Sequence, residues 1–464
     1  MRKEENGRGK NIYYLLILIT GVIICFLLGE SGPIIMPDSE MFLNPSDHIK
    51  NSYMVYVAFL KICRSIFSIE SYLYGIWILQ SVLAIVITIV VTEYIRKEYG
   101  LGYGMAYAIY CMMYLPYIYN LPENVVTHHI LTEAIAIPFV ELFFWIVLKY
   151  YNQKKSKYLL YAIGVGVLLV KTRSQMSFIL VVIVVMMIGS IIVNIYKRIN
   201  RNWKIVMFSV LLLSVMISIC MLLFIIPVLV KNNSWQQLTD AVLGRTLCTI
   251  EEEDRELFEK AEHIEAFDYV YEKIDQDKYR MTYFRENTWR ANDIAYATNE
   301  NSKAYYDWIE AFYSEYHPEI EPSELPQRMS NTSLTLISEL FRSNMTGYII
   351  MTLQLIPSSL VSSIFVQPDS LHALCYYITF VLFMGTLCGL LICYRRGVDK
   401  KFLVPMWFTL LIMFSNALFV NLLFYGQQRY VIYTFGLFYV SWVIMLKGIK
   451  DTKKYESINN YTGL

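Results

Sequence analysis

Residues 71–95 read SYLYGIWILQSVLAIVITIVVTEYI, and no charged residue precedes Glu93 in this stretch. An apolar run of this length crosses a hydrocarbon core of about 30 Å as a single helix. The 464-residue chain as a whole is 56% hydrophobic and 17% charged, which is too apolar for a soluble or disordered protein. The sequence therefore predicts an all-α polytopic membrane protein.

Other apolar stretches share the length and composition of this one, so we expect about ten transmembrane helices. The predicted spans are residues 12–29, 71–95, 101–119, 130–148, 158–172, 175–195, 204–230, 371–393, 402–424 and 430–446. No small-residue cleavage site follows the first span before Glu30. We therefore expect that span to be a retained anchor rather than a signal peptide.

Lysine and arginine are distributed unequally over the connections between these spans. If the N-terminus is inside, the inner segments hold 22 of them and the short outer segments hold 6. Cytoplasmic loops carry such an excess, so we expect a multi-pass protein of the cell membrane with both termini in the cytoplasm. The many Ile, Tyr, Lys and Asn residues favour a bacterial source.

Three regions follow from this topology. Residues 1–230 form a seven-helix transmembrane module, whose first outer loop, 30–70, is predicted to carry amphipathic helices. Residues 231–370 form an extracytoplasmic region with 24 acidic and 12 basic residues, expected to be mostly helical. Within it, the apolar stretch 333–365 is expected to lie at the membrane surface. Residues 371–464 supply three further spans and a cytoplasmic tail.

Charge and cysteine content exclude two classes of function. The net charge of +1 gives no reason to expect a nucleic-acid partner, which needs a concentrated excess of Lys and Arg. The eight cysteines form no CxxC pair and fall mostly in apolar runs. Neither a disulfide framework nor a zinc site is indicated.

Acidic candidates lie at two places on the predicted outer face. Asp38 and Glu40 follow the first span, and such a pair can act as a general base or hold a divalent cation, or be ordinary loop charges. Glu133, preceded by His128 and His129, begins the fourth span. An ionisable group at membrane depth is a functional candidate, although the helix dipole also favours a carboxylate there.

Basic candidates lie on the same face. Lys171 and Arg173 stand in the turn between the fifth and sixth spans, against the usual insertion bias. A bound phosphate would compensate for them, and so would a salt bridge from Arg173 to Glu133 or Asp38. Arg429 precedes the last span beside the interfacial Tyr430, where an arginine also snorkels to the surface.

Acidic groups and guanidinium groups at one membrane face form a set suited to activating a hydroxyl while neutralising a phosphate leaving group. This is the chemistry of sugar transfer from a lipid phosphate. We therefore expect an integral membrane glycosyltransferase.

The order of these features resembles the GT-C superfamily of membrane glycosyltransferases, which contains the protein O-mannosyltransferases and the lipid A aminoarabinose transferases. The resemblance covers essentially the whole chain and rests on short elements. These are Asp38-Ser39-Glu40 in the first outer loop, the amphipathic segment after it, Leu131-Thr132-Glu133, Lys171-Thr172-Arg173-Ser174-Gln175 and Gln428-Arg429-Tyr430. Ser39 departs from the family pattern, because several relatives have adjacent acidic residues at this place.

The resemblance implies a sugar on a polyprenyl phosphate as donor, inversion at the anomeric carbon and a lipid, glycan or protein acceptor. It implies that Asp38 is the catalytic base and that Glu40 and Glu133 orient the acceptor or assist the base. The donor phosphate would be held by Arg173 and Arg429 with Lys171, and the acceptor or auxiliary residues would be His128, His129 and Tyr430. A divalent cation stays open, and no other cofactor is expected.

Three alternatives share the same features. A polymerase or ligase of surface polysaccharide would use the same lipid phosphate with a longer acceptor. A flippase or transporter of a lipid-linked sugar would place its charged site near the bilayer midplane, where only Glu141 lies deep enough. A structural or sensory membrane protein also stays open.

Overall fold

The computed structural model describes residues 2–28, 32–119, 121, 125–196, 242–280, 283, 290–364, 372–423 and 428–462. Over these ranges the chain is built of helices and holds no strand, and one isolated β-bridge joins Ile34 and His129. The prediction of an all-α fold holds for this part of the chain.

The chain divides into two compact units. The first unit comprises Met1–Leu223, Ser362–Asn416 and Arg429–Leu464, and the second comprises Phe224–Val361 and Ala417–Gln428. All candidate site residues lie in the first unit.

Seven helices within the described ranges are long and apolar enough to cross a membrane. They cover Gly9–Leu27, Tyr72–Glu98, Glu133–Gln153, Met345–Ser362, Leu374–Arg395, Lys400–Leu422 and Ile432–Thr452. Apolar helices of this length fit a membrane protein, as predicted. The count differs from the predicted ten.

At two predicted spans the helix is shorter than any of these seven. The stretch 101–119 holds α6 (Tyr103–Met113) of only 11 residues, because Pro116 follows in a 3₁₀ turn and a proline nitrogen cannot continue the helical ladder. The stretch 158–172 is α8 (Ser156–Thr172), of 17 residues.

The remaining differences concern three other stretches. The stretch 175–195 begins with a 3₁₀ turn at Ser174–Ser177 before α9 (Phe178–Tyr196). The predicted span 204–230 lies outside the described residues. In the other direction, α16 (Met345–Ser362), expected at the membrane surface, is long and apolar enough to cross it despite Pro357.

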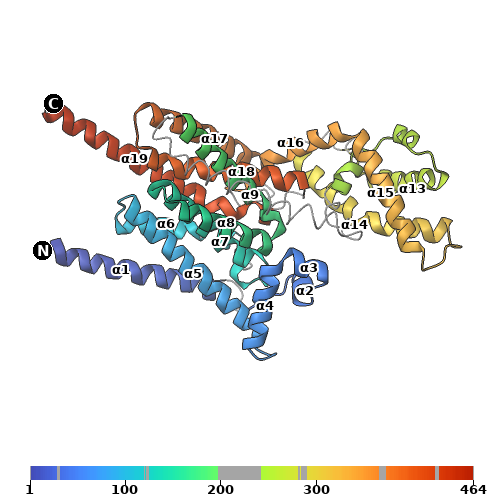
Figure 1. Cartoon of the computed structure of the whole chain (residues 1–464), viewed down its shortest axis with the longest axis horizontal. Coiled ribbons are helices and arrows are strands. Elements are labelled where there is room, and N and C mark those ends of the chain that lie inside the picture. Colours follow the sequence, from blue (N-terminus) through green and yellow to red (C-terminus); the bar gives the residue numbers. More distant parts are fainter. Residues whose placement is uncertain are drawn as a thin grey trace. The chain divides into compact units, whose positions relative to one another are not determined.

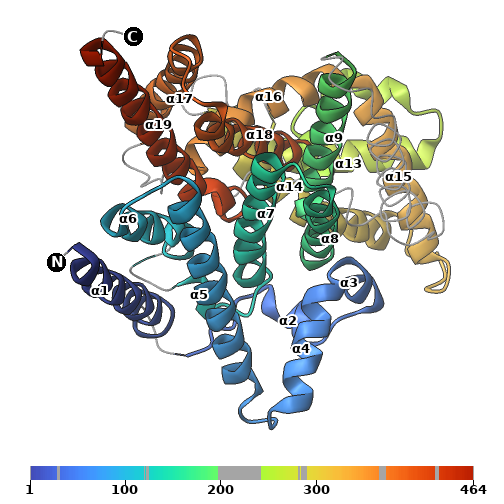
Figure 2. The ribbon, with the colours of Figure 1, turned by 60° about the vertical axis from the view of Figure 1, so that its left-hand side comes forward.

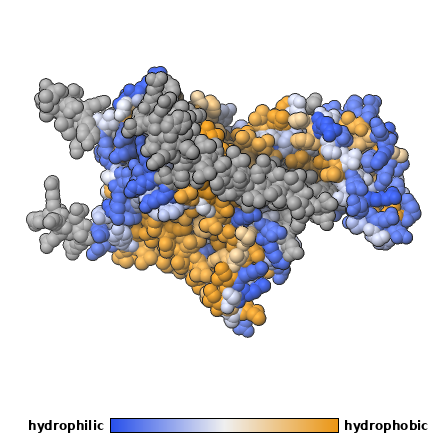
Figure 3. All heavy atoms as spheres, in the orientation of Figure 1, coloured by the Kyte–Doolittle hydropathy of each residue, from blue (hydrophilic) through white to orange (hydrophobic). Residues whose placement is uncertain are grey.

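The core of the first unit is a group of helices packed side by side. α7 forms a hairpin with α8 and also packs against α5, and α6 packs against α1, α5 and α19 (Figures 1 and 2). The bounds not yet given are α1 Arg2–Val22, α5 Tyr72–Glu98, α7 Glu133–Gln153, α17 His372–Arg395, α18 Lys400–Leu423 and α19 Phe435–Thr462. Apolar residues gather in a broad face over the region of α5 in Figure 3, as a lipid-facing helix requires.

The first outer loop folds into three short helices, α2 (Ser39–Leu43), α3 (Asp47–Ser52) and α4 (Met54–Ile66). α4 is amphipathic. Its buried side, which includes Tyr56 and Leu60, joins an apolar cluster with Ile130 and Leu131 near the start of α7. This cluster holds the loop that carries Asp38 against the segment that carries Glu133.

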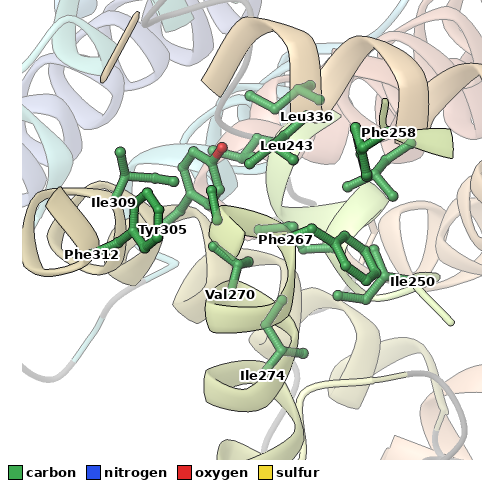
Figure 4. Packing of buried hydrophobic residues seen from close by; sticks show 14 of the residues in the cluster. Leu243, Ile250, Phe258, Phe267, Val270, Ile274, Tyr305, Ile309, Phe312 and Leu336 are labelled. Carbon is green, nitrogen blue, oxygen red and sulfur yellow. The ribbon is translucent and has the colours of Figure 1, made fainter. Parts of the chain in front are cut away.

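The second unit has its own apolar core, formed by α13 (Ala261–Asp277), α14 (Arg290–Tyr316) and α15 (Leu325–Ser343). Phe267, Tyr305, Phe312 and Leu336 are buried together in it, as Figure 4 shows. The residues of each helix that enter this core recur at helical spacing while charged residues occupy the other faces, so this acidic region folds as amphipathic helices.

Candidate functional site

The site begins with a buried ion pair between two helix ends. Glu133 is the first residue of α7, and Arg173 directly follows α8 in an extended backbone conformation. The Arg173 guanidinium lies 2.6 Å from Glu133 Oε2 and donates a hydrogen bond of 2.7 Å to Thr132 Oγ1. The side chains are only 10% and 4% exposed. We call this the deep pair.

A second ion pair lies closer to solvent. Asp38 immediately precedes α2, and its Oδ2 lies 2.7 Å from a guanidinium nitrogen of Arg429. Here the Arg429 side chain is 25% exposed and the Asp38 side chain 40% exposed. We call this the shallow pair.

Tyr430 joins the two pairs. Its ring lies 4.9 Å from the guanidinium carbon of Arg173 and 5.1 Å from that of Arg429, so it makes a cation–π contact with each. Arg429 also donates a hydrogen bond of 3.2 Å to the Tyr430 hydroxyl. Four groups singled out in separate parts of the sequence therefore form one continuous cluster.

The backbone of Tyr430 is fixed by two amide side chains. Its carbonyl accepts a hydrogen bond of 2.6 Å from Gln175 and one of 3.0 Å from Asn416. Gln175 also accepts a bond of 2.8 Å from Arg173 Nε. The backbone that carries the bridging ring is thus held by residues from two other parts of the chain.

Tyrosines surround the cluster and lower its polarity. Tyr53 and Tyr119 interact electrostatically with both Arg173 and Glu133. Burial raises the pKa of the Tyr53 phenol, and it raises the pKa of Tyr119 to about 12. In such surroundings the attraction between charges is stronger than in water.

One oxygen of the deep pair has no hydrogen-bond partner among the described residues. Glu133 Oε2 contacts Arg173, and Thr132 donates a further bond of 3.1 Å to it. Glu133 Oε1 is buried and accepts no hydrogen bond from any described residue. A buried carboxylate oxygen is stabilised by a donor, so Oε1 is an acceptor position for a hydroxyl group.

The two adjacent histidines have different surroundings. The His128 Nε2 atom lies 3.0 Å from the backbone carbonyl of Cys25, and the ring packs edge-on against Trp77. His128 is therefore part of the packing around α1. His129 interacts electrostatically with Glu133 and Arg429, and burial lowers the pKa of its imidazole to about 4. His129 thus stands beside the cluster as a neutral group.

Two other predicted site residues contact different parts of the chain. The exposed Glu40 on α2 accepts a hydrogen bond from the side-chain amide of Asn44, which directly follows this helix. Lys171 donates a bond of 3.2 Å to the backbone carbonyl of Asn51. Of the described contacts, none joins either residue to the two ion pairs.

Glu141, two helical turns deeper on α7, accepts a hydrogen bond of 2.8 Å from Thr88 on α5. This hydrogen bond joins two neighbouring helices of the first unit. No group of three or more His, Cys, Asp or Glu side chains that could hold a metal ion occurs within the described ranges.

Three of the polar residues that build the site were not predicted as site residues. Thr132 and Gln175 stand inside the sequence elements that drew attention to Glu133 and Arg173. Asn416 stands in an apolar stretch of α18. A polar amide in such a stretch could have marked it as a candidate site residue.

The arrangement can hold an anion and accept a proton at the same place. Two guanidinium groups lie on one aromatic ring, each paired with a carboxylate, and the more exposed carboxylate belongs to Asp38.

No protein-family model, curated protein or solved structure matches the chain.

Proposed function

We propose that the protein is a glycosyltransferase of the cell membrane that moves a sugar from a polyprenyl phosphate to a hydroxyl acceptor on the extracytoplasmic face. The single observation that carries this proposal is the cluster in which Tyr430 joins the deep pair to the shallow pair. The order of the sequence elements, which resembles the GT-C superfamily with about ten spans, agrees with it.

The charges of the cluster suit a phosphate that arrives with the donor. The two arginines and the two carboxylates sum to no net charge at neutral pH, so the cluster is stable without a ligand. A phosphate forms bidentate hydrogen bonds with a guanidinium as a carboxylate does. On this proposal the donor phosphate binds Arg429 in place of Asp38, because the shallow pair is the more exposed of the two.

When the donor phosphate displaces Asp38 from Arg429, the Asp38 carboxylate becomes available as a general base. The freed carboxylate takes the proton of the acceptor hydroxyl as that oxygen attacks the anomeric carbon of the sugar. The bond between the anomeric carbon and the phosphate oxygen breaks, and polyprenyl phosphate leaves with the electron pair. Attack from the face opposite the phosphate inverts the configuration.

The deep pair has a positioning role in this scheme. Arg173 stays bound to Glu133 Oε2 and contributes its charge to the phosphate across the ring of Tyr430. Glu133 Oε1 accepts a hydrogen bond from the acceptor and so orients it. His129, neutral at physiological pH, adds no competing charge.

The test is transfer by the full-length protein in proteoliposomes. Undecaprenyl phosphates carrying different isotopically labelled sugars are offered one at a time with crude envelope acceptors, and the label leaving the lipid is measured. The Asp38→Asn variant is expected to lower the rate about 10² to 10⁴-fold, because a general base contributes on that scale. Donor binding is expected to persist, since the substitution removes only a competitor of the phosphate.

Glu40→Gln is the matched control, because Glu40 lies two residues from Asp38 and has no described contact with the cluster. It is expected to keep the rate. Equal loss in both variants, or unchanged turnover in Asp38→Asn, would remove Asp38 from the role of base. Movement of the labelled lipid across the bilayer without transfer would indicate a flippase instead.

A further inference from the structure

A groove lies on the α7–α8 hairpin, and the end that carries Lys149 and Lys157 is remote from the candidate site. It has a volume of about 760 Å³ and is lined mainly by apolar atoms. Trp145 and Ile146 supply one wall from α7, and residues between Tyr158 and Leu168 supply the other from α8. On α7 Trp145 lies 12 residues after Glu133, about 18 Å along the helix axis, and on α8 Leu168 lies five residues before Arg173, about 8 Å. No lining residue of the groove belongs to the cluster.

The length of the groove matches one leaflet of a bilayer. Its lining on α8 runs from Lys157 to Leu168, which is about 16 Å of helix and about half of a 30 Å hydrocarbon core. The apolar rim is open, because Leu160, Tyr161 and Leu168 are 46%, 54% and 41% exposed. At Gly164 no atom lies within 4 Å of the position that a Cβ would occupy, so the floor is also open there.

Positive charge gathers at one end of the groove. The ammonium groups of Lys149 and Lys157 lie 5.6 Å and 5.3 Å from the centre of the same ring, that of Tyr158. Lys149 also lies 4.1 Å from the ring of Trp145. Among the described residues neither ammonium forms an ion pair, and α8 begins at Ser156, so the positive end of its dipole points the same way.

We propose that this groove binds an anionic phospholipid, with its phosphate at Lys149 and Lys157 and one acyl chain along Gly164. The two converging cations compensate a phosphate charge, and the apolar walls accept the chain. The positive-inside distribution places this end of the hairpin at the cytoplasmic leaflet, where anionic lipids attract each nearby Lys or Arg by about 1 kcal/mol. The proposal does not depend on the proposed transferase activity.

The test uses full-length protein in nanodiscs made from equal amounts of phosphatidylglycerol and phosphatidylcholine, released for native mass spectrometry. The ratio of the two lipids retained is the measured quantity. Lys149→Gln and Lys157→Gln are each expected to lower that ratio about fivefold, which corresponds to 1 kcal/mol. Lys97→Gln is the matched control, because Lys97 already pairs with Glu93 at 3.2 Å.

A second variant tests the groove rather than the charge. Gly164→Leu fills the floor without meeting another atom at its Cβ and is expected to abolish retention of the phosphatidylglycerol, whereas Gly164→Ala keeps it. Gly385→Leu on α17, where the Cβ also meets nothing within 4 Å, is the control. A lipid ratio unchanged by both lysine variants would overturn the proposal. So would a Gly164→Leu variant that behaves like Gly385→Leu.

Discussion

The deep pair and the shallow pair have the same chemistry in different surroundings. Both join a guanidinium to a carboxylate at less than 3 Å, and both stand against Tyr430. The deep pair is nine-tenths buried or more, while the carboxylate of the shallow pair is 40% exposed. A buried pair is costly to break because it leaves an uncompensated charge, whereas an exposed pair contributes little. The deep pair therefore builds the site, and the shallow pair is the one that can exchange partners.

The largest expected effect comes from breaking the deep pair. Arg173→Ala should lower the free energy of unfolding by about 3 to 5 kcal/mol, because Glu133 is then left charged and buried. Thermal unfolding of the purified protein in a neutral detergent measures this. The double variant Arg173→Ala/Glu133→Gln should recover a large part of the loss. Equal instability of the single and double variants would show that packing, rather than charge, explains the effect.

The next effect uses His129, which interacts electrostatically with one member of each pair. Its pKa is about 4 in the folded protein and about 6.5 in an unfolded chain. As pH falls below 6.5, the unfolded chain takes up a proton that the folded protein does not, so stability falls between pH 6.5 and 4. The loss amounts to at most about 3 kcal/mol.

His129→Gln removes the contribution of the imidazole to this pH dependence. The pH dependence that remains in the variant comes from the other titratable groups. Unfolding midpoints at pH 7.0 and 4.5 should lie closer together in the variant than in the native protein. An identical pH dependence would mean that the imidazole is protonated in the fold.

A smaller effect is expected at the ring that the two pairs share. Tyr430→Leu should cost about 1 to 2 kcal/mol, because it removes the cation–π contacts to Arg173 and Arg429. Tyr430→Phe keeps the ring and loses only the 3.2 Å bond to Arg429, so about 1 kcal/mol or less is expected. Comparison of the two unfolding temperatures separates ring from hydroxyl, and a phenylalanine variant as unstable as the leucine variant would contradict the ring's role.

The smallest effect is expected for the shallow pair. Arg429→Ala should change stability by no more than about 1 kcal/mol. A double-mutant cycle with Asp38→Asn should give a coupling energy that falls toward zero in 1 M salt, where the screening length is about 3 Å. The same cycle on Arg173 and Glu133 should be insensitive to salt. A salt-resistant coupling between Arg429 and Asp38 would make the two pairs equivalent.

Most of the charged residues of the site could be predicted from the sequence. Which arginine pairs with which carboxylate could not. Positive residues in a short outer turn run against the insertion bias, and this marked Arg173 as needing a negative partner, whereas Arg429 was marked by its place beside the interfacial Tyr430. The sequence left that partner open between a phosphate, Glu133 and Asp38, because the choice depends on how α7, α8 and the first outer loop pack in three dimensions.

The fold could be predicted to the level of class. Hydropathy identifies α5 and α7 because their apolar runs are single helices. It overestimated the helix at 101–119, where a turn at Pro116 interrupts a run that is apolar throughout. It did not predict that α16 is long enough to span a membrane, because Pro357 and nearby serines suggest a surface helix. The backbone nevertheless stays helical through Pro357. Such breaks depend on local backbone geometry rather than on mean hydropathy.

The segment just before α7 is hydrogen-bonded to the first outer loop, and Asp38 and Glu133 each follow this contact closely in the sequence. The Ile34 nitrogen donates to the His128 carbonyl at 2.8 Å, and the Ile130 nitrogen donates to the Ile34 carbonyl at 3.0 Å. Asp38 follows Ile34 by four residues, and Glu133 follows His129 by four residues. Helices respond to a thicker or thinner bilayer by tilting, and a tilt of α1 or α7 would carry both carboxylates together. The spacing between the two acids should therefore be independent of lipid chain length.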